Sequence, residues 1–232
     1  MSGHVDDFVF QPDEFSGRAR LFPLPNLVMF PHVLQPLHVF EPRYRELLED
    51  ALAGDRLIAM AVLKPGWEAD YEGRPPIYPV VCLGRIASHQ QLEDGRSNLL
   101  LVGLRRAGVV RELPAARSFR EAEVLVLDDL YPAQTAGRRP DLQRRLIERF
   151  RHLMPNVQEL HQQLDEVLAN EVPLGMLTDI LAFTLKLDLE TKEQLLRETN
   201  VDRRAARLLK VMQSEADSDR TDAKFPPDFS PN

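Results

Sequence analysis

The 232-residue chain contains one cysteine, one tryptophan and five lysines, and 7% of its residues are aromatic. Cys82 has no second cysteine with which to form an internal disulfide or a Cys-x-x-Cys metal site, which is typical of a reducing compartment. We expect it to be a small buried strand residue. The apolar runs are only a few residues long, whereas a bilayer-spanning helix needs about 20. The start, MSGHVDDFVF, also lacks the basic region of a secretory leader, so we expect a cytoplasmic protein without a membrane span.

Motifs for catalysis and metal binding are missing as well. The six histidines include no His-Glu-x-x-His pair, and no serine lies in a Gly-x-Ser-x-Gly turn. No lysine follows a glycine in the pattern of a phosphate-binding loop. The acidic pairs Glu93-Asp94 and Asp128-Asp129 fall at turns, where solvation and capping explain them. We therefore predict no catalytic residue, no metal site and no cofactor.

The charge balance argues against one class of partner. The formal net charge is −7 and the isoelectric point is near 5.4, whereas nucleic acid attracts clustered positive charge. Nucleic acid is therefore an unfavoured partner, although a local basic patch is compatible with this composition. With 44% hydrophobic and 28% charged residues, the chain has the composition of a compact protein of one large core or two lobes.

Prolines interrupt the apolar segment Leu21–Leu52, LFPLPNLVMFPHVLQPLHVFEPRYRELLEDAL. Because proline removes a backbone donor and fixes φ near about −65°, this segment favours short, bent or edge strands over one long central strand. The prolines concerned are Pro23, Pro25, Pro31 and Pro36. Pro42 suits the first turn of a helix, and Gly54 suits its end. The apolar spacing between Pro42 and Gly54 is three and four residues, which predicts an amphipathic helix.

Further short apolar runs bounded by turn residues are strand candidates. They are Leu57–Leu63, Val80–Gln91, Ser97–Leu104, Val109–Glu112 and Phe119–Leu127. The central residues of Glu93–Arg96 are Asp94-Gly95, and this pair predicts a hairpin because both residues tolerate positive φ. Six or more short strands with one helix indicate a small, partly closed barrel.

From Pro140 onwards the apolar period becomes helical, which predicts a helical bundle. The helical stripes fall in Leu142–Leu153, Val157–Leu168, Leu174–Leu185, Thr191–Arg197 and Val201–Met212. Asp128–Arg139 lacks periodicity and marks the connection between the two parts. We divide the chain into an N-terminal extension (1–17), a β-rich lobe (18–130), a helical lobe (131–213) and a polar, disordered tail (214–232).

Five blocks in this order resemble the amino-terminal, substrate-binding domain of the Lon protease family. They are Leu21–Leu52, Val81–Ile86 (VCLGRI), Leu99–Arg111 (LLLVGLRRAGVVR), Glu121–Leu127 (EAEVLVL) and Thr191–Met212. The resemblance spans about Arg20 to Met212. It implies an α+β fold: a PUA-like pseudo β-barrel of short, mostly antiparallel strands with one helix, followed by a C-terminal helical bundle. Full-length Lon enzymes continue into ATPase and serine–lysine protease modules, which this sequence lacks, so we expect a stand-alone member.

Two sets of residues are candidate partner-binding surfaces. The first is the aromatic set of the linker Lys64–Pro79, because rigid aromatic side chains anchor partners; the alternative is that these side chains cap the core. The aromatic set is Trp67, Tyr71 and Tyr78. The second is a basic set around the first bundle helix, since arginine holds carboxylates or phosphates with two hydrogen bonds; the alternative is a solvated helix face. The basic set is Arg138, Arg139, Arg144, Arg145, Arg149 and Arg151.

The resemblance implies a non-enzymatic module that recognises exposed or extended polypeptide segments, as an adaptor or beside a separate protease, with weak homodimerisation as a further property. An open edge of a bent sheet next to a helical lobe suits this role, because an extended peptide adds to such an edge through backbone hydrogen bonds. One alternative is a PUA-like RNA-binding module that uses Arg144 and Arg145. A second alternative is a peptidase-associated hydrolase.

Overall fold

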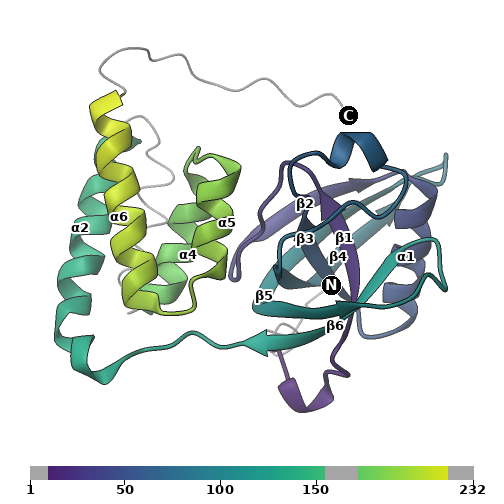
Figure 1. The fold of residues 1–232 in the computed structure, drawn as a ribbon, viewed down its shortest axis with the longest axis horizontal. Coiled ribbons are helices and arrows are strands. Elements are labelled where there is room, and N and C mark those ends of the chain that lie inside the picture. Colours follow the sequence, from purple (N-terminus) through teal and green to yellow (C-terminus); the bar gives the residue numbers. More distant parts are fainter. Residues whose placement is uncertain (1–9, 155–171, 219–232) are drawn as a thin grey trace.

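A computed structural model describes residues 10–154 and 172–218 of the chain. In these residues a β-rich lobe and a helical lobe lie side by side, joined by an extended connection between β6 and α2 (Figure 1). The strands are β1 (Arg18–Leu24), β2 (Leu34–Val39), β3 (Leu57–Val62), β4 (Val80–Gln91), β5 (Ser97–Glu112) and β6 (Arg120–Leu127). The helices are α1 (Pro42–Ala53), α2 (Arg139–Leu153), α4 (Leu174–Thr184), α5 (Leu189–Arg197) and α6 (Val201–Ser218). The described residues also include the short 3-10 helices η2 (Pro12–Glu14), η3 (Trp67–Asp70) and η4 (Ala133–Arg138).

The six described strands form one mixed sheet in the order β2-β5-β4-β3-β1-β6, with a further pairing between β5 and β6. The β1–β3 pair is parallel, and the other pairs are antiparallel. This arrangement confirms the predicted α+β fold with mostly antiparallel strands. The narrower prediction of a PUA-like pseudo-barrel is not confirmed.

The prolines lie where the sheet does not require their missing N–H group. Pro36 is in β2, the terminal strand of the sheet, as expected for an edge strand. Pro23 lies inside the sheet, in β1, but the pairing of β1 with β6 stops at Leu21, so Pro23 faces only β3. The Tyr44 hydroxyl donates a hydrogen bond to the Pro23 carbonyl at 3.0 Å, which binds α1 to the end of this strand.

The predicted hairpin and first helix are confirmed, but the prediction for β5 is wrong in one respect. Gly95 has φ of 80° in the turn between β4 and β5, and Gly54 ends α1. Ser97–Leu104 and Val109–Glu112, predicted as two strands, belong to the single 16-residue strand β5. Pairing with β4 as far as Gly108 and with β6 from Arg106 onwards keeps β5 continuous, and local register shifts accompany its bending.

The helical lobe contains the predicted helices that fall in the described residues. Pro173 precedes α4, and α2, α4 and α6 pack against one another. The predicted stripe Val157–Leu168 lies outside the described residues. α6 continues to Ser218, beyond the predicted lobe boundary at residue 213, and the Ser214 hydroxyl donates to the Val211 carbonyl at 2.8 Å. Residues 1–9 and 219–232 are not described, so the extension and the rest of the tail stay a prediction.

The main hydrophobic core runs through both lobes. The segment between β1 and β2 contributes Met29 and Phe30, which belong to the same buried cluster as Leu177 and Leu181 of α4. A second cluster, which includes Leu21, lies within the β-rich lobe. The close approach of the β1–β2 segment requires Gly103 in β5, since a Cβ there would lie 2.0 Å from the Phe30 carbonyl oxygen. The two lobes therefore share one core.

A network of four charged side chains also joins the lobes; three of them are buried, and the fourth, Asp129, is 21% exposed. Arg106 of β5 donates to Asp179 of α4 with both terminal nitrogens, one of them at 2.9 Å from Oδ2, and its Nε donates to the Leu196 carbonyl at 2.8 Å. Arg204 of α6 donates to Asp129 at 2.6 and 2.9 Å, and its Nε lies 3.2 Å from Asp179 Oδ1. Burial would raise the pKa of Asp129, but the hydrogen bonds and charge of Arg204 lower it below its ordinary value. We call Arg106, Asp129, Asp179 and Arg204 the interlobe network.

Replacing Asp179 by asparagine should destabilise the protein by about 3–5 kcal/mol, because it leaves two buried guanidinium groups without their shared counter-charge. Chemical denaturation measures the change in the free energy of unfolding. The matched control is Asp141→Asn, which removes an exposed carboxylate that pairs with Arg144 and should cost less than about 1 kcal/mol. Equal losses for the two variants would contradict the structural role of the interlobe network.

A second buried carboxyl group lies on α5, which packs against β4. Glu193 is 1% exposed, its Oε1 has no hydrogen-bond partner among the described residues, and the nearest cation, Arg197 Nε, lies 3.6 Å away. Burial raises the pKa of Glu193 above its ordinary value of 4.5. The protonated acid therefore fits the folded state better than the carboxylate does.

Glu193→Gln should stabilise the protein at neutral pH, because the amide resembles the protonated acid. A raised folded-state pKa gives a stability contribution that is complete below 4.5 and is lost as the pH rises through the folded-state value. Thermal denaturation should thus show a higher midpoint for the variant at pH 7 and little difference at about pH 4. Glu49→Gln, at an exposed position of α1, is the control and should change both midpoints little. A variant less stable than the native chain at pH 7 would refute the assignment.

Candidate polypeptide-binding surface

β2 forms an exposed edge of the sheet. It ends the strand order and pairs with β5 alone among the strands that the structure describes. Leu34 at its start is 56% exposed, and Phe40 just beyond its end is 44% exposed. Between them, His38 Nδ1 lies 2.7 Å from Asn98 Oδ1, and the His38 ring lies 6.0 Å from the Phe40 ring.

The edge is uncharged as well as exposed. The segment Leu21–Phe40 contains no Asp, Glu, Lys or Arg residue. Soluble proteins commonly protect an edge strand with charged side chains, because unpaired backbone groups there pair with other chains. β2 carries Pro36 but no such charge, so this edge, with Leu34 and Phe40 beside it, suits an extended apolar segment.

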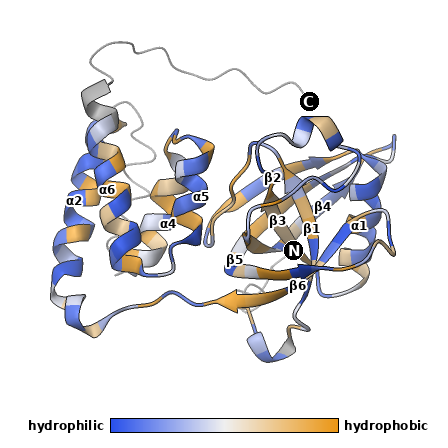
Figure 2. Cartoon of the chain, in the orientation of Figure 1, coloured by the Kyte–Doolittle hydropathy of each residue, from blue (hydrophilic) through white to orange (hydrophobic). Residues whose placement is uncertain are grey.

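Two other large exposed apolar side chains differ from Leu34 in their backbone surroundings. Val110 is 57% exposed on β5, and Leu125 is 66% exposed near the end of β6, which is one of the hydrophobic stretches of the β-rich lobe (Figure 2). The registers give these positions at most one paired strand: Val110 lies at a register shift of the β5–β6 pair, beyond the last β4 partner at Gly108, and Leu125 pairs with β5 but lies beyond the last β1 partner at Glu123. Exposed apolar side chains are therefore not confined to β2, but β2 alone among the described strands has a single neighbouring strand along its whole length.

The aromatic set of the sequence prediction divides in the structure. Trp67 and Tyr71 form an edge-to-face pair with ring centroids 5.4 Å apart. The guanidinium carbon of Arg43 lies 4.6 Å from the Tyr71 ring centroid and 4.8 Å from the Tyr44 ring centroid, and the Tyr71 hydroxyl donates to Glu41 at 2.9 Å. These contacts hold the 3-10 helix η3 against the start of α1.

Tyr78 lies apart from this pair. It is partly buried and packs against the main hydrophobic core, with Lys64 Nζ 5.9 Å from its ring centroid. This position matches the alternative in which the aromatic side chain caps the core. Trp67 and Tyr71 are half-buried and remain candidates for partner contact.

Most of the basic set is paired with neighbouring groups. Arg144 donates to Glu148 at 2.8 Å and also pairs with Asp141. Arg149 Nε donates to the Met212 carbonyl at 3.1 Å, which ties α2 to α6. Arg139 donates to Asp202 at 2.9 Å, and this hydrogen bond lowers the pKa of Asp202 below its ordinary value. These three arginines thus have structural partners on the helical lobe.

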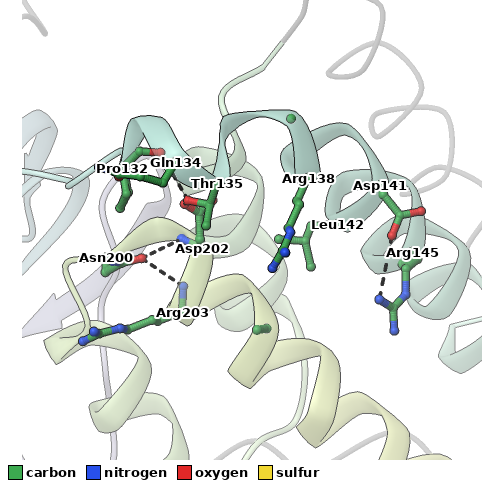
Figure 3. A pocket seen from close by; sticks show the side chains of 12 residues that line it. Pro132, Gln134, Thr135, Arg138, Asp141, Leu142, Arg145, Asn200, Asp202 and Arg203 are labelled. Atoms are coloured by element: carbon green, nitrogen blue, oxygen red, sulfur yellow. Dashed lines mark hydrogen bonds and ion pairs between the residues drawn. The ribbon is translucent and has the colours of Figure 1, made fainter.

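Arg138 and Arg145 line a pocket of about 710 Å³ between η4, the first turns of α2, and α6. Figure 3 shows both side chains extending toward the space beside α6, while Arg203 extends in another direction. Asn200 accepts hydrogen bonds from the backbone N–H groups of Asp202 and Arg203 at 3.1 Å each. Arg145 is 3.8 Å from Asp141, a long ion pair, so the pocket presents cationic groups that are only partly neutralised.

A smaller cleft of about 290 Å³ lies at the junction of the lobes. Its lining includes Arg106 and Asp129 of the interlobe network, together with Arg105, Tyr131 and His32. The His32 backbone has φ of 66°, an uncommon value for a residue with a side chain, and its N–H donates to the Gly103 carbonyl at 2.8 Å. Arg106 and Asp129 are paired within the interlobe network, so their charges are not free for a ligand in this cleft.

The described residues contain neither a metal cluster nor a membrane helix. Within residues 10–154 and 172–218, no group of three or more His, Cys, Asp or Glu side chains is placed to hold a metal ion. No helix in the same residues is both long enough and apolar enough to span a membrane. Cys82 is buried, as the sequence predicted, and burial raises the pKa of its thiol.

Sequence reasoning missed Leu34, Phe40 and the interlobe network. A signal existed for the network, since Asp179 is the only charged residue in α4. A lone charge within an apolar segment indicates a buried partner of opposite sign, although it does not identify that partner. For the β2 edge, the signal was the uncharged stretch Leu21–Phe40.

The comparisons with known proteins agree with this fold. Residues 18–214 match the family model described as the ATP-dependent protease La (LON) substrate-binding domain. The Lon protease of Heliobacterium modesticaldum is 27% identical over 196 residues, which cover 84% of this chain and 24% of that protein. Lon protease 2 of Herpetosiphon aurantiacus is 26% identical over 209 residues, which cover 88% of this chain and 25% of that protein. The chain therefore spans about a quarter of the length of these curated relatives.

Two solved structures share the fold. The N-terminal domain of Mycobacterium avium complex Lon protease aligns with a TM-score of 0.62 at 15% identity, over 84% of this chain and 98% of that one. The Lon N-terminal domain protein from Xanthomonas campestris aligns with a TM-score of 0.57 at 23% identity, over 83% and 97% of the two chains. These alignments show the fold, and the family model, which matches most of the sequence, identifies the family. This chain belongs to the LON substrate-binding domain family.

Proposed function

We propose that this chain recognises extended, uncharged segments of other polypeptides and holds them at the edge strand β2. The observation that carries the proposal is an exposed, uncharged strand edge, with Leu34 and Phe40 beside it, in a domain of the LON substrate-binding family. Backbone hydrogen bonds at a strand edge are made with any sequence, so binding tolerates many partners. Ordering a flexible segment costs conformational entropy, so the affinity is modest.

We further propose that the chain acts without catalysis of its own, as an adaptor that presents segments to a separate protease. The family model concerns substrate binding, and the chain spans only about a quarter of the Lon proteases to which it is similar. Trp67 and Tyr71 are candidate secondary contacts for a bound chain, because they are half-buried and lie outside the hydrophobic core clusters. In this proposal, hydrolysis belongs to the partner.

Charge introduced at the β2 edge should reduce polypeptide capture. In Leu34→Asp/Phe40→Asp, an approaching apolar segment would have to bury carboxylates, so crosslinking to a denatured model polypeptide should fall roughly tenfold. Both residues are exposed, so the thermal midpoint should change little. The matched control is Leu125→Asp, which adds a charge at an exposed position of β6, a strand that does not pair with β2, and should retain capture. Equal capture by the native chain and the double variant would refute the location of the site.

A PUA-like RNA-binding module is the second candidate function, and the pocket beside Arg138 and Arg145 is the observation that favours it. Carboxylates nearby, at Asp141 and Glu148, reduce the attraction of this surface for phosphates. We expect no salt-dependent retention of single-stranded RNA in a filter-binding titration. Retention that Arg138→Ala/Arg145→Ala abolishes would replace the polypeptide proposal with the RNA-binding one.

A further inference from the structure

The backbone groups of β2 alternate between β5 and the outside of the sheet. The Gly103 N–H donates to the Val33 carbonyl at 2.9 Å, so Val33 faces β5. Residues that face the neighbouring strand recur at every second position of an antiparallel pair. Gln35, Leu37 and Val39 therefore direct their backbone groups toward β5, and the residues between them direct theirs outward. The outward residues are Leu34, Pro36 and His38.

A side-chain contact supports this assignment. Opposed residues whose backbone groups face away from each other bring their side chains closest together. His38 is opposite Asn98 in the register, and the two side chains are in hydrogen-bonding contact at 2.7 Å. Pro36 lies two residues before His38, so its backbone groups also face away from β5. Its missing N–H therefore removes no hydrogen bond from the β2–β5 ladder.

The backbone hydrogen-bonding groups on the outward edge of β2 consequently differ from one position to the next. Leu34 and His38 each present a donor and an acceptor, whereas Pro36 between them presents only an acceptor, and this carbonyl already accepts a hydrogen bond from Gln35 Nε2 at 2.8 Å. An added strand from another protein would lose one hydrogen bond opposite Pro36. Two copies of β2 paired about a two-fold axis at Pro36 would place proline opposite proline and lose both central bonds.

We propose that β2 binds one extended segment of another polypeptide as an additional strand, through the outward backbone groups of Leu34 and His38, and that Pro36 disfavours pairing with a second copy of this chain. The inference rests on the proposed function and specifies its binding mode and partner. It also separates this edge from the weak homodimerisation expected from the sequence.

The side chains of β2 indicate the chemistry of the segment. Leu34, Pro36 and His38 are exposed on one face of the strand, and Phe40 continues past its end. This face offers apolar surface at both ends and no carboxylate, lysine or arginine. The preferred segment is therefore uncharged, with β-branched or aromatic residues at alternate positions.

Leu34→Pro and Leu34→Ala distinguish backbone pairing from side-chain contact. Both substitutions remove the leucine side chain, but only proline removes the outward donor. With a short fluorescent peptide of alternating valine and threonine, Leu34→Pro should bind roughly threefold or more weakly than Leu34→Ala. The two variants should have similar denaturation midpoints, whereas Leu37→Pro should lose stability because its N–H belongs to the β5 ladder. Equal peptide affinities, or a Leu34→Pro variant as unstable as Leu37→Pro, would overturn the inference.

Pro36→Val supplies the missing donor and tests the selectivity for a foreign segment. We expect the peptide to bind roughly 2- to 10-fold more tightly, since one hydrogen bond is added. Analytical ultracentrifugation should show dimers of the variant at concentrations where the native chain is monomeric. Unchanged affinity together with an unchanged monomer would overturn the role of Pro36.

These results can be separated from a failure of the proposed function. If the native chain captures no denatured polypeptide, the proposed function fails before the binding mode is tested. If capture occurs and Leu34→Asp/Phe40→Asp reduces it, but Leu34→Pro and Leu34→Ala behave alike, the proposed function holds and backbone pairing is wrong.

Discussion

The arrangement of this protein depends on four paired charges between its lobes, three of which are buried. Arg106, Asp129, Asp179 and Arg204 come from β5, the β6–α2 connection, α4 and α6, so the network closes only when the helical lobe has one orientation on the sheet. Unpaired charge in this position would be costly, which penalises other orientations. The helical lobe is thus held against β4 and β5, through α5 and Arg106, and the outer edge of β2 remains unpaired among the described strands.

An unpaired strand edge can bind a partner, but it can also pair with unwanted chains and aggregate. β2 has features that favour binding and features that limit aggregation. Its lack of charge leaves it open to apolar segments, while its length of six residues and its central proline limit how many bonds a partner makes. Binding at such an edge is sequence-tolerant because the backbone does most of the recognition. The proposed role in recognising other polypeptides requires this tolerance.

Local signals predicted local structure well. Pro42 and Gly54 delimit α1, Asp94-Gly95 forms the hairpin, and Pro173 precedes α4, because each depends on residues adjacent in sequence. Features that depend on distant residues were missed. The continuity of β5 through Arg105–Gly108 results from pairing with β4 and β6. Most arginines of the basic set form hydrogen bonds or ion pairs within the protein, as Arg139 does with Asp202. The candidate edge was predictable as a proline-containing strand, but its terminal position in the sheet was not.

Amide hydrogen exchange of β2, resolved by residue with NMR, tests the central claim most directly. In the free protein the amides of Leu34 and His38 should exchange rapidly, while those of Gln35 and Leu37, bonded to β5, should be protected. Addition of a denatured polypeptide should slow exchange at Leu34 and His38 and leave Gln35 and Leu37 unchanged. If binding occurs without new protection at Leu34 and His38, the segment does not pair with β2 and the account is contradicted.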